Sequence, residues 1–457
     1  MATRTGTATQ RLAEFALGIR YDDLPPDVVR RTKELFLDFL GVACGGRLAD
    51  SAPPLLRAVA RLRGDGSGEA SVAGEASLYP SHYAALLNGA FAHSQDFDDT
   101  HRDAVLHPGA PVFAALLALA EPSHAPGREF LAAAVAGYEV TCRLGRAHGE
   151  AVHARGFHPT ATTGIFGATA ACARLLALGQ PALLDAWGLA LSQAAGSLQF
   201  LQNGAWNKRV HVGMAAHDAI VALAMAREGV VGAAEPFTGR FGYYFSYAGE
   251  QRDLERAVAT LGQDFEVMHV AIKPYPCCRY NHAVIDGLVA LARQYDLGPE
   301  DVASVEVELP PAGVPLVAEP EGPKREPANV VDAQFSVYFA AAIALAEGGF
   351  TWDSYRRLGD RQVLGLASRV RARGAPRHDL GARVTVVTTA GERLEEEVPL
   401  AKGEPERPLA WEELLAKFRP LAEAVVGEQA ATELVALVER LEDVDDMALV
   451  ARRLRPS

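Results

Sequence analysis

Apolar and small residues recur at the spacing of an α-helix through most of the first 272 residues of this 457-residue chain. The pattern begins after Pro25-Pro26-Asp27, where Val28, Leu35 and Phe39 fall on one face of a 3.6-residue repeat. Gly and other small residues separate further segments of the same kind, at 109–120, 129–144, 162–178, 183–197 and 212–229. No run in this region alternates as a strand does, so we expect a large all-helical unit.

The pattern changes after Lys273. Residues 302–309 alternate apolar and charged side chains, which is typical of a half-buried strand. Residues 332–345 are spaced as a helix, and residues 382–398 predict a β-hairpin with its turn at Gly391. This part of the chain therefore predicts a smaller α+β unit.

Helical spacing returns from Leu409 to the C-terminus. We therefore predict a mainly α fold, with a helical domain at 1–272, an inserted α+β lid domain at 273–405, and C-terminal helices at 406–457 that pack back on the helical domain. A cleft between two such domains is a common place for a ligand.

Composition limits the classes of partner. The formal net charge of −13 disfavours nucleic acid and anionic membranes, whereas a small anionic substrate needs only a local basic pocket. Residues 1–20 lack the apolar run of a secretory signal, and no apolar run reaches the ~20 residues of a spanning helix. The five cysteines include no CxxC pair. We therefore expect a cytoplasmic protein with reduced thiols and no membrane contact.

Residues 88–109 contain the densest cluster of titratable side chains, with four carboxylates and three histidines. Asp96 is expected near the end of a helix, where the helix dipole and repulsion among carboxylates both raise carboxyl pKa values. In a metal-free acid–base interpretation Asp96 activates or orients a neighbour, while His101 or His107 moves protons. The alternatives are a solvated acidic loop and a metal site, but the rhythm Asp96-Phe-Asp98-Asp99 does not suit a magnesium-binding run.

Two other stretches combine charge or histidine with a helix start. His158 precedes a helix rich in small residues, whose free N–H groups can bind an anion. Lys208 and Arg209 precede another helix among apolar neighbours, where unpaired cations would be costly and a carboxylate or phosphate ligand would offset the cost. At the proposed domain junction, the vicinal pair Cys277-Cys278 is interpreted as packing rather than as a redox or metal site.

Together these stretches resemble the MmgE/PrpD family, which includes 2-methylcitrate dehydratases, cis-aconitate decarboxylases and iminodisuccinate epimerases. The resemblance is carried by AHSQDFDDTH at 92–101, HPG at 107–109, GFHPTATTG at 156–164, NGAWNKRVHVGMAAHDA at 203–219, GRFGYY at 239–244, KPYPCCRYNHA at 273–283 and GEPERPL at 403–409. It implies a homodimer and chemistry without a metal or an organic cofactor. The family's functional positions fall on Asp96, Thr100, His107, His158, Lys208 and Lys273.

Two positions depart from the cis-aconitate decarboxylases of the family. Cys278 stands where these enzymes are expected to have a catalytic histidine. Phe339, beside Tyr338, stands where they are expected to have a tyrosine. These departures favour dehydration over decarboxylation.

The working hypothesis is a metal-independent lyase that dehydrates a 2-methylcitrate-like hydroxy acid by removing a proton next to a carboxylate. Decarboxylation of a cis-aconitate-like acid and epimerisation of an iminodisuccinate-like acid are alternatives on the same site, because all three pass through a stabilised carbanion. A non-catalytic carboxylate-binding protein and a metal-dependent phosphatase or prenyl-transfer enzyme are alternatives from other classes. The residues expected to be catalytic are Asp96, Thr100, His107, His158 and Lys208, and those expected to bind substrate are His101, Arg209, Lys273, Cys278 and His282.

Overall fold

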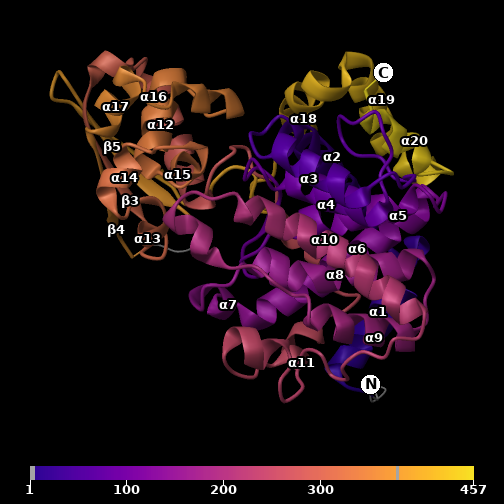
Figure 1. Ribbon diagram of the computed structural model, residues 1–457. Helices are drawn as coiled ribbons and strands as arrows, with labels where there is room; N and C mark the ends of the chain where they lie inside the picture. Colours follow the sequence, from indigo (N-terminus) through magenta and orange to yellow (C-terminus); the bar gives the residue numbers. More distant parts are fainter. Residues whose placement is uncertain (1–5, 377–379, 457) are drawn as a thin grey trace.

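The computed structural model describes residues 6–376 and 380–456. The buried apolar side chains of these residues form two separate hydrophobic cores. The first core contains buried side chains between Ala8 and Ile272 and again between Leu414 and Leu454. The second contains those between Cys277 and Ala401. Figure 1 shows the corresponding larger and smaller lobes, with the C-terminal helices packed against the N-terminal ones. The chain is mainly helical with a small mixed sheet in its C-terminal region, as predicted.

The larger lobe is built from helices that follow one another through the chain. They are α1 (Ala8–Gly18), α2 (Pro26–Arg47), α3 (Ala52–Arg63), α4 (Ser81–Ala92), α5 (Gly109–Ala120), α6 (Gly127–His148), α7 (Ala151–Ala154), α8 (Pro159–Leu175), α9 (Gln180–Leu191), α10 (Asn207–Arg227), α11 (Leu254–Val258), α18 (Trp411–Val426), α19 (Glu428–Glu439) and α20 (Ala448–Ala451). The prediction that this unit is all-helical was wrong in one detail. Strands β1 (Thr100–His101) and β2 (Val270–Ala271) pair antiparallel, and two residues are too few to show alternation in sequence.

The smaller lobe packs helices against a four-stranded sheet. Its helices are α12 (His282–Tyr295), α13 (Val314–Val317), α14 (Glu321–Arg325), α15 (Val330–Gln334), α16 (Val337–Glu347) and α17 (Arg361–Ala367), and its strands are β3 (Val302–Leu309), β4 (Val370–Gly374), β5 (Ala382–Thr388) and β6 (Arg393–Val398). The strand order is β4-β3-β5-β6, with β3 and β4 parallel and the other pairs antiparallel. The predicted strand at 302–309 and the predicted hairpin are confirmed. The helix predicted at 332–345 is instead divided between α15 and α16.

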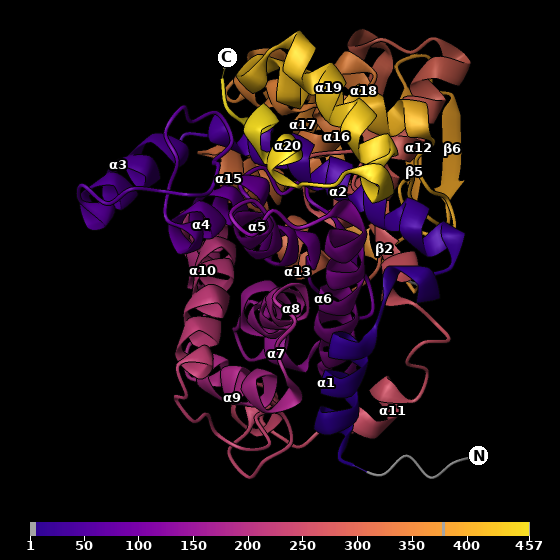
Figure 2. The same ribbon diagram turned by 90° about the vertical axis from the view of Figure 1, so that its right-hand side faces the viewer.

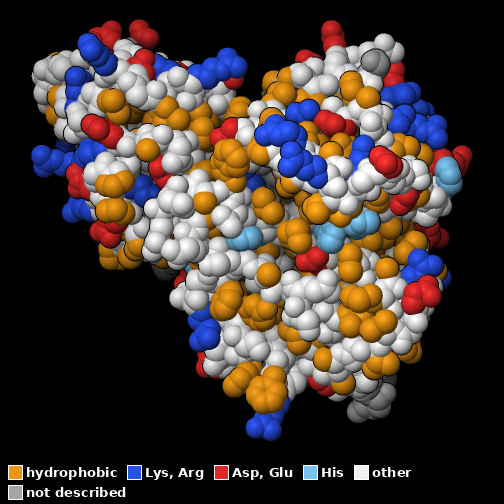
Figure 3. All heavy atoms as spheres, viewed as in Figure 1, with side chains coloured by type: hydrophobic (Ala, Val, Ile, Leu, Met, Phe, Trp, Pro, Cys, Tyr) orange, Lys and Arg blue, Asp and Glu red, His pale blue; other side chains and the backbone are white. Residues whose placement is uncertain are grey.

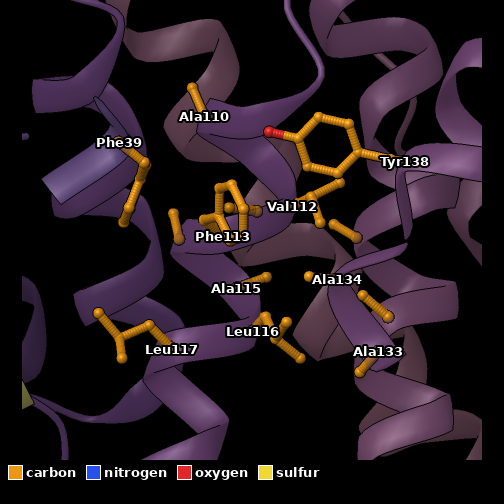
Figure 4. Packing of buried hydrophobic residues seen from close by; sticks show 14 of the residues in the cluster. Phe39, Ala110, Val112, Phe113, Ala115, Leu116, Leu117, Ala133, Ala134 and Tyr138 are labelled. Atoms are coloured by element: carbon orange, nitrogen blue, oxygen red, sulfur yellow. The ribbon is translucent and has the colours of Figure 1, made fainter. Parts of the chain in front are cut away.

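Helix α5 lies at the centre of the larger lobe, and nearly all of its side chains are buried. A helix that is apolar on all sides requires neighbours on all sides. Figure 4 shows Phe113 of α5 between Phe39 of α2 and Tyr138 of α6, at ring-centroid distances of 5.5 and 5.4 Å. Figure 2 shows α8 between α6 and α10, both of which it contacts. The segment between α4 and α5 is therefore held at the middle of a rigid bundle.

Helices α4 and α10 cross where both have a glycine. A Cβ atom on Gly213 would lie 2.2 Å from the carbonyl oxygen of Leu86, and one on Gly89 would lie 3.1 Å from the Cα of Gly213. Only glycine allows the two backbones to come this close. The crossing fixes the end of α4 relative to the start of α10.

Among the described residues, no helix combines the length and the apolar character that crossing a bilayer would require.

Gly213→Ala should destabilise the protein by about 1–3 kcal/mol, because the new methyl group has to displace the α4 backbone. Gly365→Ala in α17 is the matched control, since a Cβ at that position has no neighbour within 4 Å. The control should be unchanged or up to about 1 kcal/mol more stable. Urea unfolding of both variants gives the comparison, and equal stability of the two would refute the tight crossing.

Candidate active site

A cavity of about 690 Å³ lies between the two lobes. The larger lobe contributes residues of the 96–107 segment, the start of α8 and the start of α10. The smaller lobe contributes side chains such as Leu316 and Phe335. Figure 3 shows the smaller lobe projecting from the larger one, with the surface notched between them. The volume suits a small-molecule ligand.

Asp96 is held in the cavity wall between two lysines. Lys208 donates a hydrogen bond to Asp96 Oδ1, and Lys273 Nζ lies 3.1 Å from Asp96 Oδ2. Lys273 also donates to the backbone carbonyl of Asp96 at 2.9 Å. All three residues are buried. Burial by itself raises the pKa of Asp96, but the charges of Lys208 and Lys273 outweigh it and hold this pKa well below its usual range.

The backbone at Asp96 is unusual for a residue with a side chain. Its φ of 52° lies in the left-handed region. Such conformations cost about 1–3 kcal/mol and persist where the surroundings enforce them. The bond from Lys273 to the Asp96 carbonyl is one such restraint. A second comes from α18, where Lys417 donates to the carbonyl of Phe97 at 2.8 Å.

Asp98 lies between two imidazoles. Its Oδ2 is 2.7 Å from His93 Nδ1, and its Oδ1 is 3.3 Å from His107 Nδ1. Burial lowers the pKa of His107 and brings that of His93 to about 3, so both rings are neutral at pH 7. The other ring nitrogen of His107, Nε2, lies 4.0 Å from Asp96 Oδ1. The backbone N–H of His107 donates to Thr160 Oγ1 in the first turn of α8.

The same three residues bring potential metal-ligand atoms within 4.8 Å of one another. Two donors on a tetrahedral zinc ion are about 3.3 Å apart, because each lies about 2.0–2.1 Å from the metal. Asp98 Oδ1 and His107 Nδ1 are 3.3 Å apart, but His93 Nδ1 and Asp98 Oδ2 are only 2.7 Å apart. This spacing fits a hydrogen bond better than shared coordination.

His158 is the N-cap residue of α8 and lines the cavity. Its ring centroid lies 5.4 Å from that of His93 and 5.6 Å from that of His211. Burial, followed by the effects of His93 and Lys208, holds the pKa of His158 well below its usual range. His158 is thus another neutral imidazole at the cavity wall.

Thr100 faces a charged cluster that joins the two lobes. Its Oγ1 accepts a hydrogen bond from Arg279, which is also paired with Glu404. Arg102 lies 3.6 Å from Glu404 and 2.9 Å from Glu406. Burial lowers the pKa of Arg279 to about 9, so it is still charged at pH 7. Sequence reasoning did not select Arg279, although it lies within the stretch 273–283 that it did select.

The structure brings Asp96, Thr100, His107, His158 and Lys208 to one cavity, together with Lys273 and Cys278. Burial raises the pKa of the Cys278 thiol, which stays protonated at pH 7. His101 also borders the cavity, but its imidazole is paired with Glu266 at 3.0 Å.

Two residues expected to bind substrate lie elsewhere. Arg209 bonds to Asp50 and Ser51, and His282 Nε2 lies 3.1 Å from the carbonyl oxygen of Cys277. Neither is among the residues that line the cavity, and their contact with substrate stays a prediction. Arg209 follows Lys208 on a helix, and neighbouring residues on a helix point in different directions.

Phe335 is an aromatic side chain of the cavity that the sequence reasoning missed. Lys208 Nζ lies 5.9 Å from its ring centroid. Phe339, which stands where the decarboxylases of the family are expected to have a tyrosine, stacks on Tyr355 in the core of the smaller lobe. Phe335 lies at the break between α15 and α16 and Phe339 lies in α16, and of the two only Phe335 reaches the cavity.

Comparisons with known proteins cover both lobes. A model of the MmgE/PrpD N-terminal domain matches residues 10–255, and a model of the MmgE/PrpD C-terminal domain matches residues 275–443. The chain is 28% identical to a cis-aconitate decarboxylase-like protein of Aspergillus oryzae, over 98% of this chain and 97% of that protein. It is 28% identical to the cis-aconitate decarboxylase of Aspergillus terreus, over 96% and 94%. It is 27% identical to that of Mus musculus, over 98% and 93%.

Asp99 is a buried carboxyl group next to the site, and its titration predicts how the stability of the protein depends on pH. It accepts hydrogen bonds from the N–H of Gly109 at 2.9 Å and from the hydroxyl of Tyr138 at 2.6 Å. Burial raises the pKa of Asp99 to about 7. Because the unfolded value is about 3.9, the folded protein loses stability as pH rises from about 4 to about 7.

Asp99→Asn should remove this loss. The free energy of unfolding of the variant, relative to that of the parent, should rise by up to about 1.4 kcal/mol per pH unit between pH 4 and pH 7, and level off above that. Urea unfolding at pH 5, 6, 7 and 8 measures the difference. Asp103→Asn is the control, because its exposed side chain lies in the same segment. A difference for Asp99→Asn that is constant with pH would contradict the assignment.

Proposed function

This chain belongs to the MmgE/PrpD family, and from that premise we propose that it is a lyase for a small di- or tricarboxylate that works without a metal or an organic cofactor. The observation that carries the proposal is the charge balance around Asp96. Two buried ammonium groups, from Lys208 and Lys273, face a single carboxylate in the cavity wall. The positive charge left over favours a substrate carboxylate and the negative charge that develops next to it.

Decarboxylation of a cis-aconitate-like acid is the first reaction to test. Relatives that match nearly the whole chain are cis-aconitate decarboxylases by name, which supports this reaction over the dehydration first expected from sequence. In this step the bond between a carbon and its carboxylate breaks, CO2 leaves, and the electron pair stays on the carbon as a carbanion conjugated with a remaining carboxylate. A proton then adds to that carbon.

The pKa shifts of the cavity residues indicate which of them binds charge and which transfers protons. Asp96 is a poor base, because the two lysines keep its pKa low, and its role is to hold Lys208 and Lys273 in place. His107 is the proton-transfer group, because its Nε2 faces the Asp96 side of the cavity. Thr100 and His158 both line the cavity and contact the substrate there. Cys278 offers a protonated thiol as a further donor.

Dehydration is the second candidate, and the observation that favours it is Cys278. A thiol stands in the cavity where the decarboxylases of the family are expected to have a histidine. In dehydration His107 would take the proton next to a carboxylate, and a protonated group would donate to the leaving hydroxyl. The same lysines would stabilise the same carbanion-like state.

The two separate cores support different roles for the two lobes, in which one carries most of the cavity and the other covers it. Residues 1–272 and 406–457 form a helical domain that carries most of the cavity, and residues 273–405 form a lid domain that covers it. Closing the lid would exclude water from the carbanion. Assembly into homodimers stays a prediction.

Incubation with cis-aconitate, 2-methylcitrate, citrate and iminodisuccinate in deuterated water, followed by proton NMR, tests the proposal. We expect loss of CO2 from cis-aconitate and one deuterium in the product. Formation of an alkene from 2-methylcitrate would select dehydration, and exchange on iminodisuccinate without another product would select epimerisation. Binding of these acids without any turnover would overturn the proposal in favour of a carboxylate-binding protein.

Lys208→Met should lower kcat by about 10²–10³-fold with a smaller change in KM, because the ammonium meets charge that develops in the transition state. Lys324→Met is the matched control. Lys324 lies at a similar distance from the Phe335 ring, 5.8 Å, but does not line the cavity. The control should keep most of the activity. If Lys208→Met raises KM and leaves kcat unchanged, the lysine binds substrate without stabilising the transition state.

A further inference from the structure

The carboxylate of Asp98 touches both His93 and His107 but does not line the cavity. Its side chain is 3% exposed, and each of its two oxygens faces the Nδ1 of one imidazole. The three residues lie on the segment that joins α4 to α5, and His107 alone of them borders the cavity. Asp98 can therefore act on a substrate only through its neighbours.

An ionised carboxylate only accepts hydrogen bonds, so it favours an N–H at each imidazole nitrogen that faces it. His93 Nδ1 makes this hydrogen bond with Asp98 Oδ2 at 2.7 Å, whereas His107 Nδ1 faces Asp98 Oδ1 at 3.3 Å without hydrogen-bond alignment. The Nε2 atom of a neutral His107 is then the basic one, and it points toward Asp96 and the cavity. His93 is fully buried, and its ring packs edge-on against His107 at a centroid distance of 4.7 Å. It fixes Asp98 from the side away from the cavity.

We propose that Asp98 is a positioning residue that sets the tautomer of His107, directs its Nε2 into the cavity, and stabilises the imidazolium formed during proton transfer. The inference rests on the proposed function. In dehydration the proton leaves a substrate carbon for His107 Nε2. In decarboxylation His107 Nε2 first takes up a proton from solvent, and the resulting imidazolium then donates it to the carbanion. Asp98 stays ionised in both, as expected for a carboxylate that orients a histidine.

Contacts other than those of Asp98 hold the backbone of the segment. Lys273 holds the carbonyl of Asp96, and Lys417 holds that of Phe97. Asp99 binds the first N–H of α5. Other charged groups that interact with Asp98 are Asp38 of α2 and Lys417 of α18, which are paired with each other, and the adjacent Asp99. Replacement of Asp98 should therefore leave the backbone in place.

Asp99 provides a matched control. It is the next residue, is equally buried, and accepts two hydrogen bonds. Its partners belong to α5 and α6, and it does not line the cavity. Asp98→Asn and Asp99→Asn thus make the same chemical change at adjacent positions, and only the first one touches His107.

Steady-state kinetics on the acid that the parent converts tests the inference. We expect Asp98→Asn to lower kcat by about 10²–10⁴-fold with little change in KM, because the neutral amide no longer stabilises the imidazolium that proton transfer requires in either reaction. In dehydration, an amide that donates to Nδ1 would also leave Nε2 protonated and unable to accept the substrate proton. Asp99→Asn should keep most of kcat. Normal kcat in Asp98→Asn, or equal losses of kcat and thermal stability in both variants, would overturn the inference.

Proton NMR of the free protein gives a readout that needs no turnover. The parent should show downfield Nδ1–H resonances from His93 and His107, assigned with His93→Gln and His107→Gln. The His107 resonance should disappear in Asp98→Asn and remain in Asp99→Asn. If the parent converts none of the four acids, the proposed function fails, and these resonances alone then decide whether Asp98 sets the tautomer. A His107 resonance that is unchanged in Asp98→Asn would refute the contact.

Discussion

Asp96 is buried with its charge between Lys208 and Lys273, and this ion triad joins three distant parts of the chain. Asp96 and Lys208 are 112 residues apart, and Asp96 and Lys273 are 177 apart. Removing one partner from a buried ion pair typically costs about 3–5 kcal/mol, because the remaining charge has lost its compensation. The end of α4, the start of α10 and the segment that enters the smaller lobe are therefore held in one arrangement.

The triad also explains how a chain with a net charge of −13 can offer a site to an anion. The global field repels an anion at long range, but it is screened by salt within about 8–10 Å. Inside the cavity the nearest charges decide, and around Asp96 two lysines face one carboxylate while His107 and His158 are neutral. Asp98 is another buried anion close by, and both of its oxygens face imidazoles rather than the cavity.

Local patterns in the sequence predicted much of the fold. Helix α5 and strand β3 have the predicted bounds, because a fully apolar run and a strict alternation are each read from neighbouring residues. The split between α15 and α16 was missed, because the helical spacing continues past the break at Phe335 and Ser336. Strands β1 and β2 were missed because their pairing lies in the contact between them and not in either segment.

In the candidate site, too, features visible in neighbouring residues were predicted and contacts between distant residues were not. The sequence selected the stretches that hold Asp96, His107 and Lys208, because clustered titratable groups beside helix ends are visible locally. It described Lys208 as an unpaired cation, since the partner that compensates its charge is far away in the chain. Likewise, the contact of Arg279 with Thr100 depends on how the two lobes meet.

The most direct test of the triad as a carboxylate site is a crystal structure with tricarballylate, a saturated tricarboxylate that has neither a hydroxyl group to expel nor a double bond. The account predicts one carboxylate of the ligand within hydrogen-bond distance of Lys208 Nζ or Lys273 Nζ, with the carbon next to it facing His107 Nε2. A ligand bound outside this cavity, or one whose carboxylates contact neither lysine, would contradict it.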